Sequence, residues 1–203
     1  MKNLRFLLFF TAFAWFGNEA VAQVDKNNLL AFNEKRLQTN RNAMKVLGGW
    51  AVGNFLVSGL LIGRSEGGTK AFHQMNVGWN VINLGLAGFG YYSAMRADPA
   101  ALDLYASVKD QYGIEKTFLL NAGLDVGYML GGLYLTERAK NAGKNQERLT
   151  GCGQSILLQG GFLFVFDLAM YFIINNHGQL LEPLLKNVTL TGGLTGVGVR
   201  WDF

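Results

Sequence analysis

Cysteine, proline and charged side chains are all scarce in this chain of 203 residues. The single cysteine, Cys152, permits no disulfide within the chain and has too few partners for a metal site. Charged residues make up only 16% of the chain, where an ordinary soluble domain has about a quarter. Half of the residues are apolar and 27 are glycine, a residue more frequent in membrane helices than in soluble ones. The composition therefore predicts an integral membrane protein, with the lipid bilayer as its partner.

Motifs that would name a reaction are also missing. The net charge of +4 is spread along the chain, and no stripe of Arg and Lys with interleaved aromatic residues indicates nucleic-acid binding. The sequence has no phosphate-binding loop, no CxxC pair and no HExxH pair. Its two histidines, His73 and His177, fall at opposite ends of the expected bundle, so neither completes a catalytic set. We predict no enzyme activity, no cofactor, no metal site and no nucleic-acid partner.

Residues 1–22 have the pattern of a secretory leader. Lys2 and Arg5 precede the apolar run Phe6–Phe16, and Ala20-Val21-Ala22 supplies a small-x-small cleavage site. The run is short for a membrane span, which needs about 20 residues, so we expect a cleaved signal peptide and a mature chain from Gln23. The alternative is an uncleaved signal anchor. Both place the following segment outside the cytoplasm, in a bacterial envelope of the Gram-negative type.

Four apolar segments follow, and each is long enough to cross a bilayer as a helix. They are Leu47–Gly63, Met75–Ala94, Thr117–Leu135 and Gln154–Asn175. The sequence therefore predicts an all-α fold, a bundle of four transmembrane helices over residues 47–176 with up-down connections.

The loops between these segments predict the orientation. The loop of residues 136–152 is rich in Arg and Lys, which favours the cytoplasmic side. Both termini then lie in the periplasm and the protein in the inner membrane. Residues 26–45 oppose this orientation, because they are also basic and would invert the bundle if they dominated.

The exported segments are expected to be partly ordered. Residues 23–46 read as an amphipathic helix that leads into the first span. Pro99–Tyr112 reads as a separate short helix that Gly113 ends.

Residues 177–203 form an exported tail, and its end alternates with period two from Val188 onward. This alternation predicts a strand or hairpin with its turn at Leu190-Thr191-Gly192-Gly193. A strand that ends in a terminal Phe is also similar to the last strand of outer-membrane barrels. A barrel is the weaker alternative, because segments such as Gly160–Ile174 do not alternate apolar and polar residues.

Glycines at four-residue spacing predict close helix packing. Gly123, Gly127 and Gly131 line one face of the third span, where another backbone can approach. The pairs Gly49/Gly53 and Gly59/Gly63 repeat the spacing on the first span. The stripe on the third span is our candidate contact for a homo-oligomer.

Polar residues inside the spans share faces. His73, Asn76, Asn80 and Asn83 are three or four residues apart, which places them on one side of a helix. The same spacing joins Asn54 to Ser58, Asn121 to Asp125, and Ser155 to Gln159 and Asp167. We therefore predict a buried polar or ion site made of these side chains: Asp125, Asp167, Asn54, Asn83, Asn80, Asn121 and Gln159. His73 is the candidate proton entry.

Asp125 and Asp167 lie near the middle of their spans, where an ionised acid costs about 2.5–3.5 kcal/mol on insertion scales. No Lys or Arg lies inside a span to neutralise them. They are either protonated acids that hold helices together, acids that hold a cation, or acids that face a wet cavity. The first hypothesis is a structural or accessory protein with a polar packing core. The alternative is a proton- or cation-coupled transport component that uses the Asp pair.

The pair Asn121-x-x-x-Asp125, the segment Gln159-Gly160…Asp167 and the leader with four spans together carry a resemblance. Over about residues 40–176, the chain resembles an uncharacterised family of bacterial envelope membrane proteins. The resemblance implies a helical bundle in a membrane and no particular activity.

Overall fold

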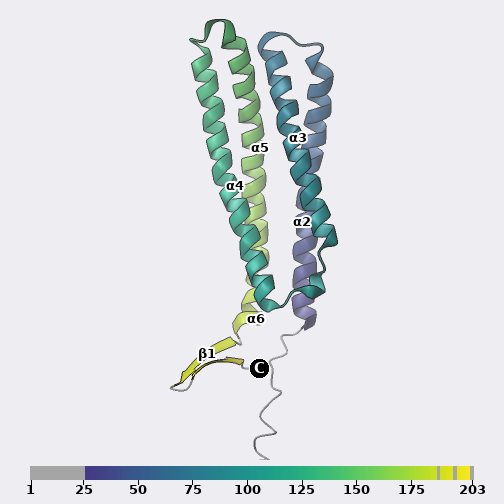
Figure 1. The fold of residues 1–203 in the computed structure, drawn as a ribbon, viewed down its shortest axis with the longest axis vertical. Helices are drawn as coiled ribbons and strands as arrows, with labels where there is room; N and C mark the ends of the chain where they lie inside the picture. The colour runs from purple at the N-terminus through teal and green to yellow at the C-terminus, as the bar shows by residue number, and fades with distance from the viewer. Residues whose placement is uncertain (1–25, 187, 194–195, 202–203) are drawn as a thin grey trace, which may run out of the picture.

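Four long helices make up most of the chain (Figure 1). The computed structural model describes residues 26–186, 188–193 and 196–201, so the expected signal peptide lies outside the described residues. The helices are α2 (Lys26–Ile62), α3 (Gly67–Arg96), α4 (Leu104–Ala139) and α5 (Gln146–Gly178). Each of the four apolar segments falls within one of them, except that Gly63 lies one residue beyond the end of α2. The all-α class is confirmed, and the barrel alternative is wrong.

Three of the described helical segments are long and apolar enough to cross a membrane, which supports a membrane location. They are α2, α4 and the run Gly143–Leu185 that contains α5. The segment expected as the second span forms α3, which is not in this set. Its polar stripe is the physical reason, because the histidine and three asparagines on that face lower its mean hydropathy.

The helices pair as two antiparallel hairpins. α2 packs along α3 and α4 packs along α5, while the contact between α3 and α5 joins the hairpins (Figure 1). α3 and α4 share no extended contact. Short 3-10 turns, Pro99–Ala101 and Gly143–Asn145, help to connect the helices.

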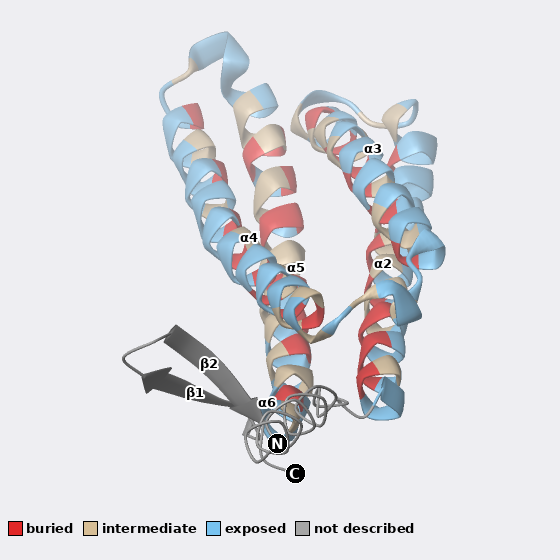
Figure 2. Cartoon of the chain, turned by 60° about the horizontal axis from the view of Figure 1, so that its bottom comes forward, coloured by how far each residue is buried: buried red, intermediate tan, exposed pale blue. Residues whose placement is uncertain are grey.

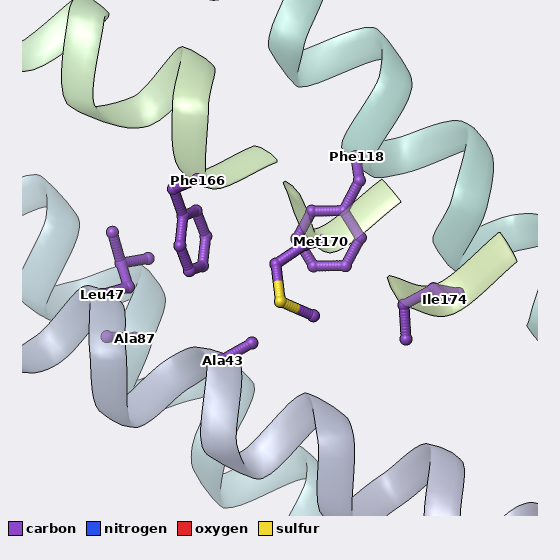
Figure 3. Close-up of a cluster of buried hydrophobic side chains, with 7 residues drawn as sticks. All are labelled: Ala43, Leu47, Ala87, Phe118, Phe166, Met170 and Ile174. Atoms are coloured by element: carbon purple, nitrogen blue, oxygen red, sulfur yellow. The ribbon is translucent and has the colours of Figure 1, made fainter. Parts of the chain in front are cut away.

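Apolar side chains from all four helices meet in one cluster (Figure 3). Phe166, Met170 and Ile174 of α5 lie beside Phe118 of α4. Ala43 and Leu47 of α2 and Ala87 of α3 complete the cluster. These contacts fix the height of each helix relative to its neighbours.

The apolar segments bury many polar side chains between the helices and expose large apolar ones, unlike a soluble bundle. Large apolar side chains stay exposed along every helix, for example Leu60 at 75%, Phe89 at 74% and Val165 at 66%. Buried positions form narrow stripes between the helices (Figure 2). In the spans these stripes hold amides, hydroxyls and carboxyls, including Asn80 and Gln159 at 0% exposure. A lipid bilayer is the environment that suits such an apolar outer surface.

The segment expected to form a separate short helix before the third span differs from the prediction. Pro99–Tyr112 is not a separate helix, because α4 runs unbroken from Leu104 to Ala139 and Gly113 lies inside it. A glycine inside a helix costs only about 1 kcal/mol relative to alanine. Burial of Gln111 and Glu115, one on each side of Gly113, favours a continuous helix.

The end of the chain forms a small antiparallel hairpin after the five-residue helix α6 (Glu182–Lys186). Strand β1 (Val188–Gly193) pairs with β2 (Gly196–Trp201). The turn expected at Leu190-Thr191-Gly192-Gly193 is therefore wrong, since these residues belong to β1.

Glycines do bring helices together, but not the expected ones. A Cβ on Gly123, Gly127 or Gly131 would meet nothing within 4 Å. All three lie on the exposed face of α4. The pairs Gly49/Gly53 and Gly59/Gly63 are equally free.

The glycines in contact lie on the face of α4 beside α5. A Cβ on Gly132 would come within 2.8 Å of the Gly153 carbonyl oxygen, and one on Gly153 within 2.7 Å of the Gly132 carbonyl oxygen. On the other side of α5, a Cβ on Gly151 would collide with the Gly68 carbonyl oxygen of α3. Four-residue spacing cannot tell which side of a helix faces another helix of the same chain. The stripe of Gly123, Gly127 and Gly131 makes no such contact, and its use as a homo-oligomer contact stays a prediction.

Candidate functional site

Asn76 is the centre of a hydrogen-bonded polar seam between α2, α3 and α5. Its side-chain nitrogen donates to Asn54 Oδ1 at 3.0 Å and to Ser58 Oγ at 2.8 Å. Its oxygen accepts from Gln159 Nε2 and, at 3.5 Å, from Ser155 Oγ. One asparagine on the α3 stripe thus ties α3 to both neighbouring helices.

The seam continues along α3 in both directions. His73 Nδ1 lies 3.1 Å from Ser58 Oγ. Gln159 Oε1 accepts from Trp50 Nε1 at 2.9 Å and from Asn83 Nδ2 at 3.4 Å. Four of the expected residues, His73, Asn54, Asn83 and Gln159, therefore share one connected network, which runs between three helices.

Asn80 is the exception within this stripe. Its nitrogen donates to the Asn76 carbonyl at 2.7 Å, whereas its buried oxygen has no hydrogen-bond partner. Asn80 is fully enclosed, at 0% exposure. It belongs to the same face but adds no bond between helices.

Asp125 of α4 and Asp167 of α5 form a second group, between α4 and α5. Their carboxyl groups are within hydrogen-bonding reach of each other, and Asn121 is within reach of Asp167. Asp125 is 2% exposed and Asp167 is 6% exposed. Asp125 Oδ2 receives no hydrogen bond from an N–H or hydroxyl group. Two carboxyl groups in contact can bond to each other only when one carries a proton.

The Asp pair borders a cavity of about 410 Å³ between the two hairpins. All four helices contribute to its walls, which are mostly apolar, and Asn83 connects it to the polar seam. Trp79 of α3 and Tyr128 of α4, both of which line it, meet edge to face with ring centroids 5.0 Å apart. The cavity therefore occupies the space that α3 and α4 leave between them.

The structure thus divides the expected site in two. Asn54, Asn83 and Gln159 belong to the seam with Asn76, and Asp125, Asp167 and Asn121 belong to the carboxyl group at the cavity. Asn83 is the residue that touches both. In the described part of the chain, no group of three or more His, Cys, Asp or Glu side chains comes together, so the carboxyl group is a site of two acids.

His73 is buried, at 8% exposure, and its bond to Ser58 joins it to the seam. The groups between it and the cavity are the amides of Asn76, Gln159 and Asn83. Amide side chains are weak proton carriers. Proton entry through His73 stays a prediction. It requires proton-carrying groups in addition to the hydrogen-bonded amides between His73 and the cavity.

A third polar cluster was missed by the sequence reasoning. It lies beyond the spans, where the first turns of α2 meet α4 and the end of α5. Asn33 donates to Ser107 Oγ at 2.9 Å, and Arg36 donates to the Ser107 carbonyl at 3.0 Å. Arg36 also pairs with Asp110 at 3.5 Å. Burial lowers the pKa of the Arg36 guanidinium from its ordinary value, and the Asp110 carboxylate opposes that effect.

The same cluster extends across α4 to α5. Gln111 donates to the Ile174 carbonyl at 2.6 Å and to Glu115 Oε1 at 2.9 Å. His177 donates from Nε2 to the Phe32 carbonyl at 3.0 Å, and its ring stacks on Phe32 with centroids 4.3 Å apart. Burial lowers the pKa of His177, whereas its bond to the Phe32 carbonyl raises it.

A signal for this third cluster was present in the sequence. Ser107, Gln111 and Glu115 are four residues apart, and Asn33 and Arg36 are three apart, so each set occupies one helix face. The residues lie in segments expected to be exported and solvated, where such a face carries little meaning by itself. The packing of α2 against the first 3-10 turn and α4 buries Asn33, Arg36 and Ser107. The packing of α4 against α5 buries Gln111 and Glu115.

A family model of unknown function, DUF6992, matches residues 46–168 of the chain. The chain belongs to this family. The DUF6992 segment contains the polar seam, both acids and all seven expected site residues. The expected resemblance to a family without an assigned activity is confirmed at that level. No curated protein and no solved structure matches the chain.

Proposed function

We propose that all four long helices cross the membrane, with α3 as a span whose polar face is turned inward. Residues 71–95 contain no Asp, Glu, Lys or Arg, and apolar side chains such as Ile82 and Phe89 cover the outer face of α3. At its end, Arg96 lies 5.1 Å from the ring centroid of Tyr92, a pairing typical of a membrane boundary.

The proposed orientation keeps the loops of residues 63–66 and 140–145 in the cytoplasm and both termini in the periplasm, with the inner membrane as the location. The positive charge of the α4–α5 loop supports it. Arg36, one of the basic residues that argued for inversion, is buried against Asp110 in the exported cluster.

Single cysteines test the crossing of α3. In a Cys152→Ser background, Arg64→Cys should react with a membrane-impermeant maleimide only from the cytoplasmic side, and Ala100→Cys only from the periplasmic side. Both positions are exposed loop residues, so the substitutions leave the core intact. Reaction of both cysteines from the same side would refute a crossing by α3.

We further propose that the protein is a proton- or cation-linked membrane component, with Asp125 and Asp167 as the exchanging groups. The observation that supports it is a pair of buried carboxyls, in contact, beside a cavity and without a Lys or Arg partner. Ionisable residues inside a membrane are rare, because each one is costly to bury, and they mark ion and proton pathways.

The second candidate is the accessory role, in which polar side chains specify helix packing. The seam around Asn76 supports it, since amide and hydroxyl bonds there join three helices. Bonds of this kind contribute only about 0.6 kcal/mol each on average. The two candidates concern different regions of the structure. In the seam, amide and hydroxyl groups form hydrogen bonds with one another, whereas Asp125 and Asp167 border the cavity.

Proton flux into liposomes that contain the purified full chain separates the two candidates. Under an imposed membrane potential, a pH-sensitive dye inside the liposomes should report flux with wild type and a near-complete loss with Asp125→Asn or Asp167→Asn. Asparagine keeps the shape and one acceptor oxygen but cannot exchange a proton. Glu137→Gln is the matched control, because it removes an exposed carboxylate of α4 that pairs with Lys140 at the end of the same helix.

If both Asn variants fold and conduct as wild type does, the exchange proposal is wrong. Parallel assays with sodium and potassium gradients identify a cation other than the proton. If both variants fail to accumulate while Glu137→Gln accumulates normally, the acids act in packing and the accessory role is favoured.

A further inference from the structure

The cavity beside the Asp pair has the features of a ligand site that opens to lipid. Its volume of about 410 Å³ falls in the range of small-molecule sites, about 300–1,000 Å³. Such sites combine apolar walls with a few convergent polar groups. Here the polar groups are Asp125, Asp167, Asn121 and Asn83.

We propose that this cavity binds a lipid-soluble primary amine, with its apolar body between α3 and α4 and its ammonium group on Asp125 and Asp167. This inference rests on the proposed function only in using the same two acids. It adds the chemical class of the ligand and its route of entry.

The route of entry follows from the helix packing. α3 and α4 share no extended contact, so the cavity is not closed by helix packing on that side. The side chains at its mouth are apolar and exposed, with Ile82 at 62%, Leu86 at 58% and Leu124 at 48%. In a bilayer these positions face acyl chains. A ligand therefore enters sideways from the lipid and not along the bundle axis.

The walls select an apolar body. Leu47 of α2, Ile114 of α4 and Leu163 and Phe166 of α5 line the interior. At one end, the edge-to-face pair of Trp79 and Tyr128 bridges α3 and α4. These walls provide favourable burial for a hydrocarbon chain or ring.

The polar end selects a cation. Asp125 Oδ2 receives no bond from an N–H or hydroxyl group, and an ammonium group supplies three such donors. None of the residues that line the cavity in the described structure is Lys or Arg. A carboxylate or an anionic phosphate head would therefore meet like charge with nothing to neutralise it, which argues against fatty acids and anionic phospholipids.

Amine binding also requires release of a proton. Before binding, the two carboxyls share one proton in the bond between them. The ammonium ion enters as R–NH₃⁺, both carboxylates face it, and the shared proton leaves to solvent. Charge is conserved, since one positive ion replaces another.

Photolabelling of the full chain in lipid nanodiscs tests the inference. The probe is dodecylamine that carries a diazirine in its chain, and the matched probe is the corresponding alcohol. The amine should label cavity residues such as Leu86 and Leu163, as mapped by mass spectrometry. Loss of one charge-assisted bond in Asp125→Asn or Asp167→Asn should reduce this labelling at least about tenfold.

A second pair of variants does not alter the acids. Leu86→Trp fills the mouth and should also reduce labelling, whereas Val81→Trp should not, because Val81 is on α3 with 54% exposure but does not line the cavity. Both substitutions add a large side chain to an exposed position of the same helix.

Equal labelling by the amine and the alcohol would overturn the inference. Labelling spread over lipid-exposed positions such as Leu60 and Phe89, unchanged in the Asn and Trp variants, would overturn it as well. Acid-dependent proton flux without amine labelling leaves the proposed function standing and refutes the ligand. Site-specific amine labelling without flux supports the ligand and refutes the exchange.

Discussion

Replacement of Gly132 by alanine should weaken the contact between α4 and α5 on which the position of the Asp pair depends. The added Cβ would lie 2.8 Å from the Gly153 carbonyl oxygen and 2.9 Å from Leu157 Cγ. One of these neighbours is backbone, so relief requires that the two helices move apart. Gly131, the adjacent residue, provides the matched control, because a Cβ there meets nothing within 4 Å.

The magnitude follows from two opposing effects. Overpacking of a tight contact costs about 1–3 kcal/mol, and alanine gains about 1 kcal/mol over glycine inside any helix. Gly132→Ala should therefore be destabilising by about 0–2 kcal/mol, while Gly131→Ala should be stabilising by about 1 kcal/mol. The two variants should differ by about 1–3 kcal/mol, which corresponds to roughly 2–12 °C in Tm for a chain of this size.

The assay is thermal unfolding of both variants in the same detergent or nanodisc, followed by far-UV circular dichroism. The comparison cancels the helix propensity of alanine, since both substitutions are in α4. If Gly132→Ala melts at or above the temperature of Gly131→Ala, the close approach of α4 and α5 at this glycine does not determine stability.

Two further predictions concern the cluster outside the spans. Arg36→Met should lower stability by about 1–3 kcal/mol, because it removes the bond to the Ser107 carbonyl and the pair with Asp110; denaturant unfolding measures it, and exposed Lys35→Met should change little. Wild type should lose stability as pH falls below about 6.5, the ordinary pKa of His177, because burial lowers the pKa in the folded state and the unfolded chain binds the proton more readily. The contribution is present above that pH and is lost as pH falls toward the folded-state pKa. His177→Asn should flatten this part of the stability profile, and an unchanged slope would contradict the assignment.

Sequence spacing alone could predict the faces of the polar stripes. His73, Asn76, Asn80 and Asn83 repeat at three and four residues, and a helix has only one face with that period. The structure buries all four on that face. A lipid environment makes the inference strong, because a polar stripe on a span has few alternatives to burial against another helix.

The choice of neighbour could not be predicted in the same way. Gly123 and Gly127 have the same four-residue spacing that a packing stripe needs, yet they face outward, while Gly132 and Gly153 make the close contact. Local spacing records which residues share a face and not which helix lies opposite. The division of Asn54 from Asp125 had the same cause, since both are polar and deep but they lie on α2 and α4, which have little contact with each other.

The burial of the third polar cluster could not be predicted from the sequence for a different reason. Arg36 and Glu115 are charged residues outside the spans, where exposure is the ordinary expectation. They are 1% and 7% exposed because Arg36 of α2 packs against α4, and Glu115 of α4 packs against the end of α5. The burial of Arg36 and Glu115 therefore depends on the length of the helices more than on the local composition of the sequence.

The unbroken length of α4 has a mechanical consequence. At 1.5 Å per residue, its 36 residues span about 54 Å, whereas the hydrocarbon core of a bilayer is about 30 Å thick. Gln111 and Asp125 therefore lie on one continuous helix. Gln111 is outside the apolar segment and bonds to α5, and Asp125 is inside it. Because no break in the helix separates them, a twist or tilt of the exposed end of α4 moves the Asp125 carboxyl as well. A protein or ligand that binds at the exposed end could therefore change the position of this carboxyl.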